Sequence, residues 1–431
     1  MSNRLMNTVL ILLIFAPLSG AAAQDAVPGL LTQQQAVDLA LACNPELRIS
    51  TERMVGVRER VRQAREFPNT SLEADFDQQV DFLDSREQYF GFTQEFEFPT
   101  RMGLRVDAAK EDVRAAEAEH RLTAWETALA AKTLYQDLTL AQGLVSLGRE
   151  NLALAERLSS MAREKYELGA VSKLEVLRAG VETASTANEL SRLEKEELAS
   201  RMRLNYLLGR APEEPLHTVP LAPGQTELDH PDRLVDAALE QRLELKTISG
   251  RLAAAEFQEK LARSAYAPDL SFSFYRHRVD EEPNSWDIAL GISVPIFGLG
   301  AIAGQVAEAR AEKAAIDAEG AAARARVELE VRSAHRAMEE LAAQLGRYRE
   351  AILAPAEEAF RLASASYAEG EIESLELLDA QRTLQDVRQA FAESVYEHNL
   401  ALIDLEQAVG TDLGWEMPAA AAGAHAPGEM E

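Results

Sequence analysis

Apolar and polar residues alternate one by one in four stretches of the chain, grouped in two widely separated pairs. The first pair covers about 69–80 and 87–98, and the second covers about 269–279 and 286–297. Strict alternation over such lengths predicts strands with one apolar and one polar face. Each pair therefore predicts a β-hairpin.

The apolar faces of these hairpins need a cover. Lipid provides it in a membrane barrel, and a second sheet provides it in a soluble sandwich. So few strands cannot close a soluble core between the long helices that follow, and we favour the membrane barrel. Beyond the N-terminal segment no apolar run is long enough for a transmembrane helix, so strands are the elements expected to enter a bilayer.

A very long helix is predicted after each hairpin, over about 101–167 and about 301–368. The first contains no proline and would be roughly 100 Å long at the rise of an α-helix. Two seams of apolar residues repeat every seven positions along it, which predicts a packed neighbour on each side, as in a closed ring of helices. The second helix is interrupted at Pro355, where we expect a kink or a local change of register.

Each long helix ends at a glycine, Gly169 or Gly370, and a further helix is predicted over about 172–209 or about 373–409. Glycine tolerates the left-handed conformation that caps a helix. Each pair of helices is therefore predicted to fold back as a helical hairpin.

The chain is a tandem duplication. Eight residues around the first helical turn recur at a constant offset of 201: Tyr166, Gly169, Leu174, Glu175, Leu177, Ala179, Leu204 and Gly209 match Tyr367, Gly370, Leu375, Glu376, Leu378, Ala380, Leu405 and Gly410. We assign the repeats to 24–210 and 232–410, with a proline-rich connector at 211–231. Residues 411–431 are predicted to be a disordered tail.

Composition and the N-terminus place the protein outside the cytoplasm. Residues 1–23 have a basic start, a short apolar run and a small-residue cleavage site, which predicts a signal peptide. The formal net charge of -27 argues against nucleic acid as a partner. The single cysteine, Cys43, excludes an internal disulfide and lies too far from the apolar segment to predict N-terminal lipidation.

The whole mature sequence resembles the TolC family of outer-membrane efflux proteins. The residues that carry the resemblance are Leu31-Thr32, Ala36, Ala40 and Asn44-Pro45-Glu46-Leu47, the segment from Gln94 to Gly103, the turns Tyr166-Glu167-Leu168-Gly169 and Tyr367-Ala368-Glu369-Gly370, and Leu375-Glu376-Leu377-Leu378-Asp379-Ala380-Gln381. The segment from Gln94 to Gly103 is most similar to the CzcC-like heavy-metal efflux branch. Many relatives carry a lipidated cysteine at the mature N-terminus, and this chain departs from that pattern.

The resemblance implies a mainly α fold with a membrane β-barrel. It implies a homotrimer in which each protomer gives four strands to a shared twelve-stranded barrel in outer-membrane lipid, with the long helices forming a periplasmic tunnel. The implied partners are a periplasmic adaptor protein and an inner-membrane pump of the RND type, and the duct itself would conduct small solutes passively.

Two acids near the second turn are candidates for a gate. Glu376 and Asp379 are three residues apart on one helix face, and in a trimer each would form a ring of three carboxylates. The alternative is that both are solvated acids favoured by the helix dipole. In the family, acids at the matching positions constrict the periplasmic end, so the resemblance favours the gate. Glu175 matches Glu376, whereas Arg178 replaces Asp379.

The turns themselves are candidates for docking the adaptor, since a helical hairpin end offers a small regular surface to another hairpin. The alternative is a plain connection, and the resemblance favours docking. The candidate residues are Leu168, Gly169, Ala170, Val171, Ser172, Glu369, Gly370, Glu371, Ile372 and Glu373.

No motif predicts an enzyme, a cofactor or a dedicated metal site. His277, His335 and His398 have no second ligand at metal spacing. The glycines of Gly298-Leu299-Gly300 precede a helix but follow a hairpin strand, which is the wrong context for a dinucleotide site. The sequence thus predicts a passive efflux duct. Two alternatives remain open: a conduit for type I protein secretion and a structural coiled-coil envelope protein with no pore.

Overall fold

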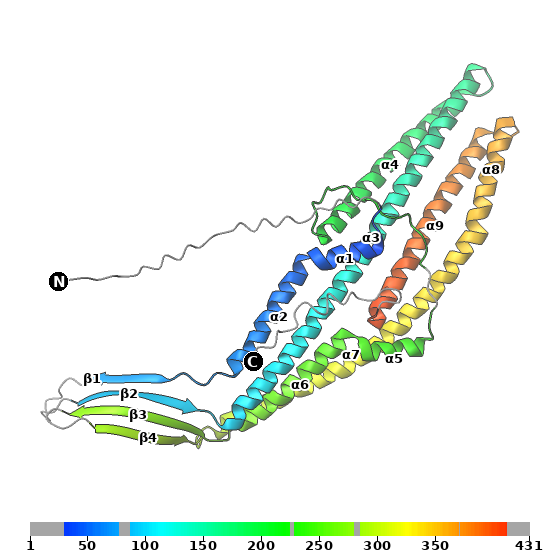
Figure 1. The fold of residues 1–431 in the computed structure, drawn as a ribbon. Helices are drawn as coiled ribbons and strands as arrows, with labels where there is room; N and C mark the ends of the chain where they lie inside the picture. The colour runs from blue at the N-terminus through cyan, green and yellow to red at the C-terminus, as the bar shows by residue number, and fades with distance from the viewer. Residues whose placement is uncertain (1–29, 77–86, 225–227, 280–284, 370, 412–431) are drawn as a thin grey trace, which may run out of the picture.

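The computed structural model describes residues 30–76, 87–224, 228–279, 285–369 and 371–411. The predicted signal peptide, most of the predicted tail, the hairpin connections and Gly370 lie outside these residues. The molecule is elongated, with a β-sheet at one end and two helical hairpins reaching the other (Figure 1). None of the described helices is long and apolar enough to cross a membrane.

Each repeat has the order of two short helices, two strands, a long helix and a returning helix. The first repeat contains α1 Gln33–Cys43, α2 Pro45–Ala64, β1 Ser71–Phe76, β2 Glu87–Phe96, α3 Pro99–Glu167 and α4 Lys173–Leu207. The second contains α5 Pro231–Gln241, α6 Leu243–Ser264, β3 Asp269–Val279, β4 Ser285–Ser293, α7 Leu299–Arg347, the π-helix η1 Tyr348–Leu353, α8 Ala354–Glu369 and α9 Ser374–Val409. The mainly α architecture with a four-stranded sheet is the fold class that the sequence predicted.

The chain begins with two short helices that meet at Asn44. Asn44 separates α1 from α2, and its side-chain oxygen accepts a hydrogen bond from the backbone N–H of Glu46 at 2.7 Å. Pro45 takes the first position of α2, where its missing N–H costs nothing. The Asn-Pro pair therefore ends one helix and starts the next.

The four strands form one antiparallel sheet in the order β1-β2-β3-β4. Leu72, Phe92, Phe274 and Ile288 lie in one row across it, and Ser71, Thr93, Ser273 and Ala289 lie in the next. The Thr93 and Ser273 hydroxyls are hydrogen-bonded at 2.9 Å, whereas Leu290 on the apolar face is 82% exposed. One face is thus polar and internally bonded, and the other presents bare apolar side chains.

Gly91 is required where the strands of the two repeats meet. A Cβ atom at this position would lie 2.3 Å from the ring of Tyr275 and 2.5 Å from the carbonyl oxygen of Phe274. The tyrosine hydroxyl beside it is 2.9 Å from the Thr93 hydroxyl. The glycine therefore makes room on the polar face for an aromatic ring from the other repeat.

Arg101 joins the sheet to the helices. The guanidinium of Arg101, in the first turns of α3, pairs with Asp269 of β3 at 2.7 Å and donates to the backbone oxygens of Ser264 and Ala267 at 3.0 and 3.2 Å. Because these groups belong to the other repeat, Arg101 fixes the two repeats together where strand passes into helix.

The long helices differ in continuity. α3 runs as one α-helix, whereas α7 and α8 are separated by the π-helix η1, which ends two residues before Pro355. The spacing between matching residues explains the difference. Pro68 and Pro268 are 200 residues apart, but Tyr166 and Tyr367 are 201 residues apart, so the second repeat contains one extra residue between these positions. A π turn accommodates one extra residue within an α-helix. The expected register change near Pro355 is therefore present, and it takes this form.

The connector between the repeats lies across the helices. The side-chain amide of Gln142 donates to the carbonyl of Leu216 at 2.7 Å, and Asn205 donates to the carbonyl of Glu214 at 2.8 Å. Farther along, the N–H of Gly224 donates to the Asn399 side chain at 2.9 Å. Side chains of α3, α4 and α9 thus provide hydrogen-bond partners for backbone groups of a connector that forms no regular helix or strand.

Candidate functional site

The first predicted tip is a tight turn capped by glycine. Gly169 has φ of +73°, and the N–H of Ala170 donates to the carbonyl of Lys165 at 2.8 Å. This left-handed cap leaves Leu168 84% exposed at the end of the molecule. The turn therefore presents an apolar side chain on a rigid backbone.

The second tip is acidic. Glu369, Glu371 and Glu373 are all exposed, and the N–H of Glu371 donates to the carbonyl of Ser366 at 2.9 Å. Gly370, predicted to cap this turn, lies outside the described residues, so that prediction stays open.

The two tips lie side by side at the same end of the molecule (Figure 1). Lys165 of α3 donates to the carbonyl of Tyr367 in α8 at 3.0 Å, and its ammonium lies 3.7 Å from the centre of the tyrosine ring. The structure thus brings together two turns that are far apart in the sequence.

Both candidate gate acids are exposed in the first turns of α9. Asp379 lines a cavity of about 500 Å³ between α4 and α9, together with Leu177, Arg178 and Leu378. Glu376 does not line this cavity. The repeat partners Arg178 and Asp379 therefore share one cavity, whereas Glu376 is set apart from it.

An ion pair that the sequence analysis missed closes this cavity. Arg382 of α9 pairs with Glu182 of α4. The pKa of the arginine is raised mainly by the hydrogen bond to Glu182 and, to a lesser extent, by the charge of that carboxylate. The repeat partner of Arg382 is the apolar Val181. The signal available in the sequence was that the second repeat has a charged residue where the first repeat has an apolar one.

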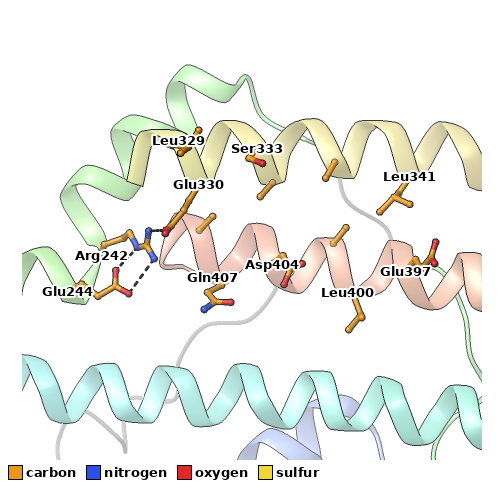
Figure 2. Close-up of a pocket in the computed structure, with 14 residues that line it drawn as sticks. Arg242, Glu244, Leu329, Glu330, Ser333, Leu341, Glu397, Leu400, Asp404 and Gln407 are labelled. Atoms are coloured by element: carbon orange, nitrogen blue, oxygen red, sulfur yellow. Dashed lines mark hydrogen bonds and ion pairs between the residues drawn. The ribbon is translucent and has the colours of Figure 1, made fainter. Parts of the chain in front are cut away.

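A second cavity, also missed, lies along α7 and α9 (Figure 2). This α7–α9 groove has a volume of about 780 Å³ and is lined by Arg242, Glu244, Leu329, Glu330, Ser333, Ala334, Ala337, Leu341, Glu397, Leu400, Ala401, Asp404, Gln407 and Ala408. Arg242 closes one end by pairing with Glu244 at 2.8 Å and with Glu330. Burial raises the pKa of the Asp404 carboxyl. The groove therefore combines apolar side chains with acidic groups from α6, α7 and α9.

Within the described part of the chain, no three histidine, cysteine, aspartate or glutamate side chains lie close enough to hold a metal ion. The acids at the tip and in the α7–α9 groove are therefore dispersed charges along the molecule.

Comparison with known proteins identifies relatives over most of the chain. The cobalt-zinc-cadmium resistance protein CzcC of Cupriavidus metallidurans is 25% identical over 370 residues, which cover 84% of this chain and 85% of that protein. Outer membrane protein OprJ of Pseudomonas aeruginosa is 27% identical over 335 residues, covering 73% and 67%. The structure of the outer-membrane channel OprN has the same fold, with a TM-score of 0.75 at 21% identity over 88% of this chain and 90% of that one.

The model of the family described as "Outer membrane efflux protein" matches residues 36–210 and 234–411. The two matched segments follow the two repeats and leave out the whole connector, so the family model matches once in each repeat. The chain therefore belongs to the outer membrane efflux protein family, as a channel of the Gram-negative outer membrane that extends into the periplasm and not as an enzyme.

Proposed function

We propose that three copies of this chain assemble around one axis into an efflux duct. In the described sheet, β1 and β4 each have a strand partner on one side only. Unpaired edges in a membrane are costly, and closing them into a barrel removes them. Three four-stranded sheets joined edge to edge would give twelve strands, with the apolar face toward lipid and the hydroxyl-lined face toward the lumen.

The tips are the proposed contact with a periplasmic adaptor, through which an inner-membrane pump of the RND type delivers the cargo. The exposed Leu168 belongs to the turn after α3, and the exposed acids Glu369 and Glu373 flank the turn between α8 and α9, with Glu371 within it. Both turns lie at the end of the molecule farthest from the sheet (Figure 1). An apolar contact beside charged ones suits the end of another helical hairpin.

The proposed cargo is a divalent metal cation. The observation that carries this is the similarity to CzcC, which extends over most of both chains and whose name refers to cobalt, zinc and cadmium. The net charge of -27 supports it, because an acidic duct concentrates cations at its entrance.

Deletion of the gene tests the cargo. We expect a host lacking this chain to become sensitive to cobalt, zinc and cadmium salts and to keep its resistance to hydrophobic drugs. Sensitivity to drugs alone would overturn the metal assignment, and loss of a secreted protein with metal resistance intact would favour the secretion conduit.

We also propose Glu376 and Asp379 as the periplasmic gate. In the trimer the two acids would form rings that bind cations and narrow the opening. We expect Glu376→Ala with Asp379→Ala to raise single-channel conductance in planar bilayers and to abolish block by divalent cations. Glu175→Ala, at the repeat partner of Glu376, is the control. Unchanged conductance and block in the double variant would exclude the gate.

A further inference from the structure

The apolar face of the sheet carries one charged side chain among the strand residues whose side chains the structure describes. Arg276 of β3 is exposed and belongs to this face, because side chains alternate along a strand and Phe274 of the same face lies two residues before it. Every other described side chain of this face is uncharged, including those of Gln94 and Leu290. A cation on a lipid-facing surface is costly at the middle of a bilayer, so its depth and its contacts decide what it can do.

A tryptophan ring holds the guanidinium in place. Arg276 and Trp286 lie opposite each other in the β3–β4 ladder, and the guanidinium carbon is 5.8 Å from the centre of the indole ring. The indole in turn stacks on Phe274, with ring centres 5.3 Å apart and 28° between the ring planes. Within the described part of the chain no carboxylate forms an ion pair with Arg276. The aromatic ring therefore orients the arginine and leaves its charge open to an anion from outside the chain.

The row of Arg276 lies in the outer part of the apolar face. β3 begins at Asp269, which pairs with Arg101 at the helical end of the sheet, and Arg276 is seven residues farther along. At about 3.3 Å per residue and a tilt of roughly 40°, this stretch rises roughly 18 Å within an apolar band about 25 Å tall. The helices extend from the other end of the sheet into the periplasm (Figure 1). The long arginine side chain can therefore reach the headgroups of the outer leaflet.

We infer that Arg276 and Trp286 bind a phosphate group of the phosphorylated glycolipid in the outer leaflet. A guanidinium pairs with phosphate through two parallel N–H···O bonds, which suits it to this anion. Below the row of Arg276, the exposed side chains of Ile288, Leu290 and Ile292 follow β4 toward the helical end. A cationic group above an apolar strip matches the order of headgroup and acyl chain in a lipid. The inference rests on the proposed duct in that its apolar face must lie toward lipid.

The lipid retained by the purified protein tests the site. We expect full-length protein extracted in mild detergent to retain the phosphorylated glycolipid, and Arg276→Gln to retain about tenfold less per chain by native mass spectrometry. Arg361→Gln is the matched control, because this arginine of α8 is 72% exposed and lies at the opposite end of the molecule. It should retain the wild-type amount. Equal retention in the wild type and both variants would overturn the site.

A titration of delipidated protein distinguishes the lipid from free phosphate. The three probes are the phosphorylated glycolipid, the same glycolipid after enzymatic removal of its phosphates, and inorganic phosphate, each followed by tryptophan fluorescence. Subtracting the response of Trp286→Phe isolates the signal of the indole at the site. We expect the dephosphorylated glycolipid to bind about tenfold more weakly and inorganic phosphate at the same concentration to give no response. Equal affinity for the two glycolipids would overturn the phosphate contact, and an equal response to inorganic phosphate would overturn the lipid as the occupant.

These outcomes are separable from those of the proposed duct, because the site lies within the sheet of one chain. A trimer whose lipid content does not depend on Arg276 would contradict the site and leave the duct intact. Protein that retains the glycolipid through Arg276 but is extracted as a monomer would contradict the proposed assembly and leave the site intact. Light scattering of the same preparations gives the oligomeric state and also shows whether Arg276→Gln is correctly assembled.

Discussion

The two repeats share one plan but differ in what covers them. In the first, α3 is a continuous helix with α2, α4, α6 and α9 packed around it. In the second, the long helix is broken by η1, and the groove along α7 and α9 is open. Both differences fall on the second repeat, whose groove along α7 and α9 is left uncovered by the described part of the chain.

The largest expected effect concerns a buried ion pair that ties the repeats together. Lys132 of α3 lies 2.7 Å from Glu406 of α9, with side chains 4% and 6% exposed. Lys132→Met removes the ammonium that pairs with this buried carboxylate and should lower the free energy of unfolding by about 3–5 kcal/mol. Urea unfolding of the detergent-solubilised protein, followed by helical circular dichroism, measures it.

The matching residue in the second repeat provides the control for Lys132. Arg332 is 47% exposed and pairs with Asp232 at 3.0 Å and Glu328 at 3.0 Å. Water screens this pair, so Arg332→Met should leave the unfolding curve unchanged. Equal losses of unfolding free energy in the two variants would show that the ion pairs at these matching positions contribute equally to stability.

The next effect separates folding from assembly. Leu129→Ala removes a buried side chain and should lower the free energy of unfolding by about 2–5 kcal/mol. Leu329→Ala should leave the unfolding of the single chain unchanged, because its side chain is exposed there, and should reduce the trimer fraction measured by light scattering. A Leu329→Ala protein with an undiminished trimer fraction would contradict the idea that Leu129 serves folding and Leu329 serves assembly.

A smaller effect is expected at the π turn. Deleting Glu350 from η1 would restore the offset of 200 and place Pro355 inside a regular α-helix, which costs about 3 kcal/mol. The deletion combined with Pro355→Leu, which introduces the residue at the matching position 154, should regain that stability. Thermal unfolding of the two variants measures the difference, and equal melting temperatures would mean that the π turn does not accommodate the proline.

The smallest effect is expected at the tip, where Arg382 and Glu182 join the hairpins of the two repeats. The arginine is 60% exposed, so the pair is screened by water. Arg382→Ala should raise the open fraction in planar bilayers by less than about fivefold. An increase that disappears when Glu182→Ala is already present would show that the ion pair is responsible. If neither change affects the conductance, the ion pair has no role in gating.

Much of the fold was predictable because its signals are local. The alternation of Leu72 and Phe92 with polar neighbours predicts strands, and Gly169 predicts the turn, since in each case the pattern depends on adjacent residues. The ion pair of Arg382 with Glu182 and the cover of Leu129 by Ile403 were not predictable in this way. They join residues about 200 and 270 positions apart, and no periodicity shows which face of a helix with two apolar seams meets which neighbour.

The sequence by itself determined that the chain is a duplicated unit of hairpin, long helix and return, because repetition and periodicity are properties of the order of residues. Only the tertiary structure decided that α9 covers α3 while α7 stays bare, and that the extra residue of the second repeat is absorbed in a π turn. The reason is physical: Leu129 and Leu329 are the same residue at matching positions, and the free energy of each depends on the side chain that lies against it.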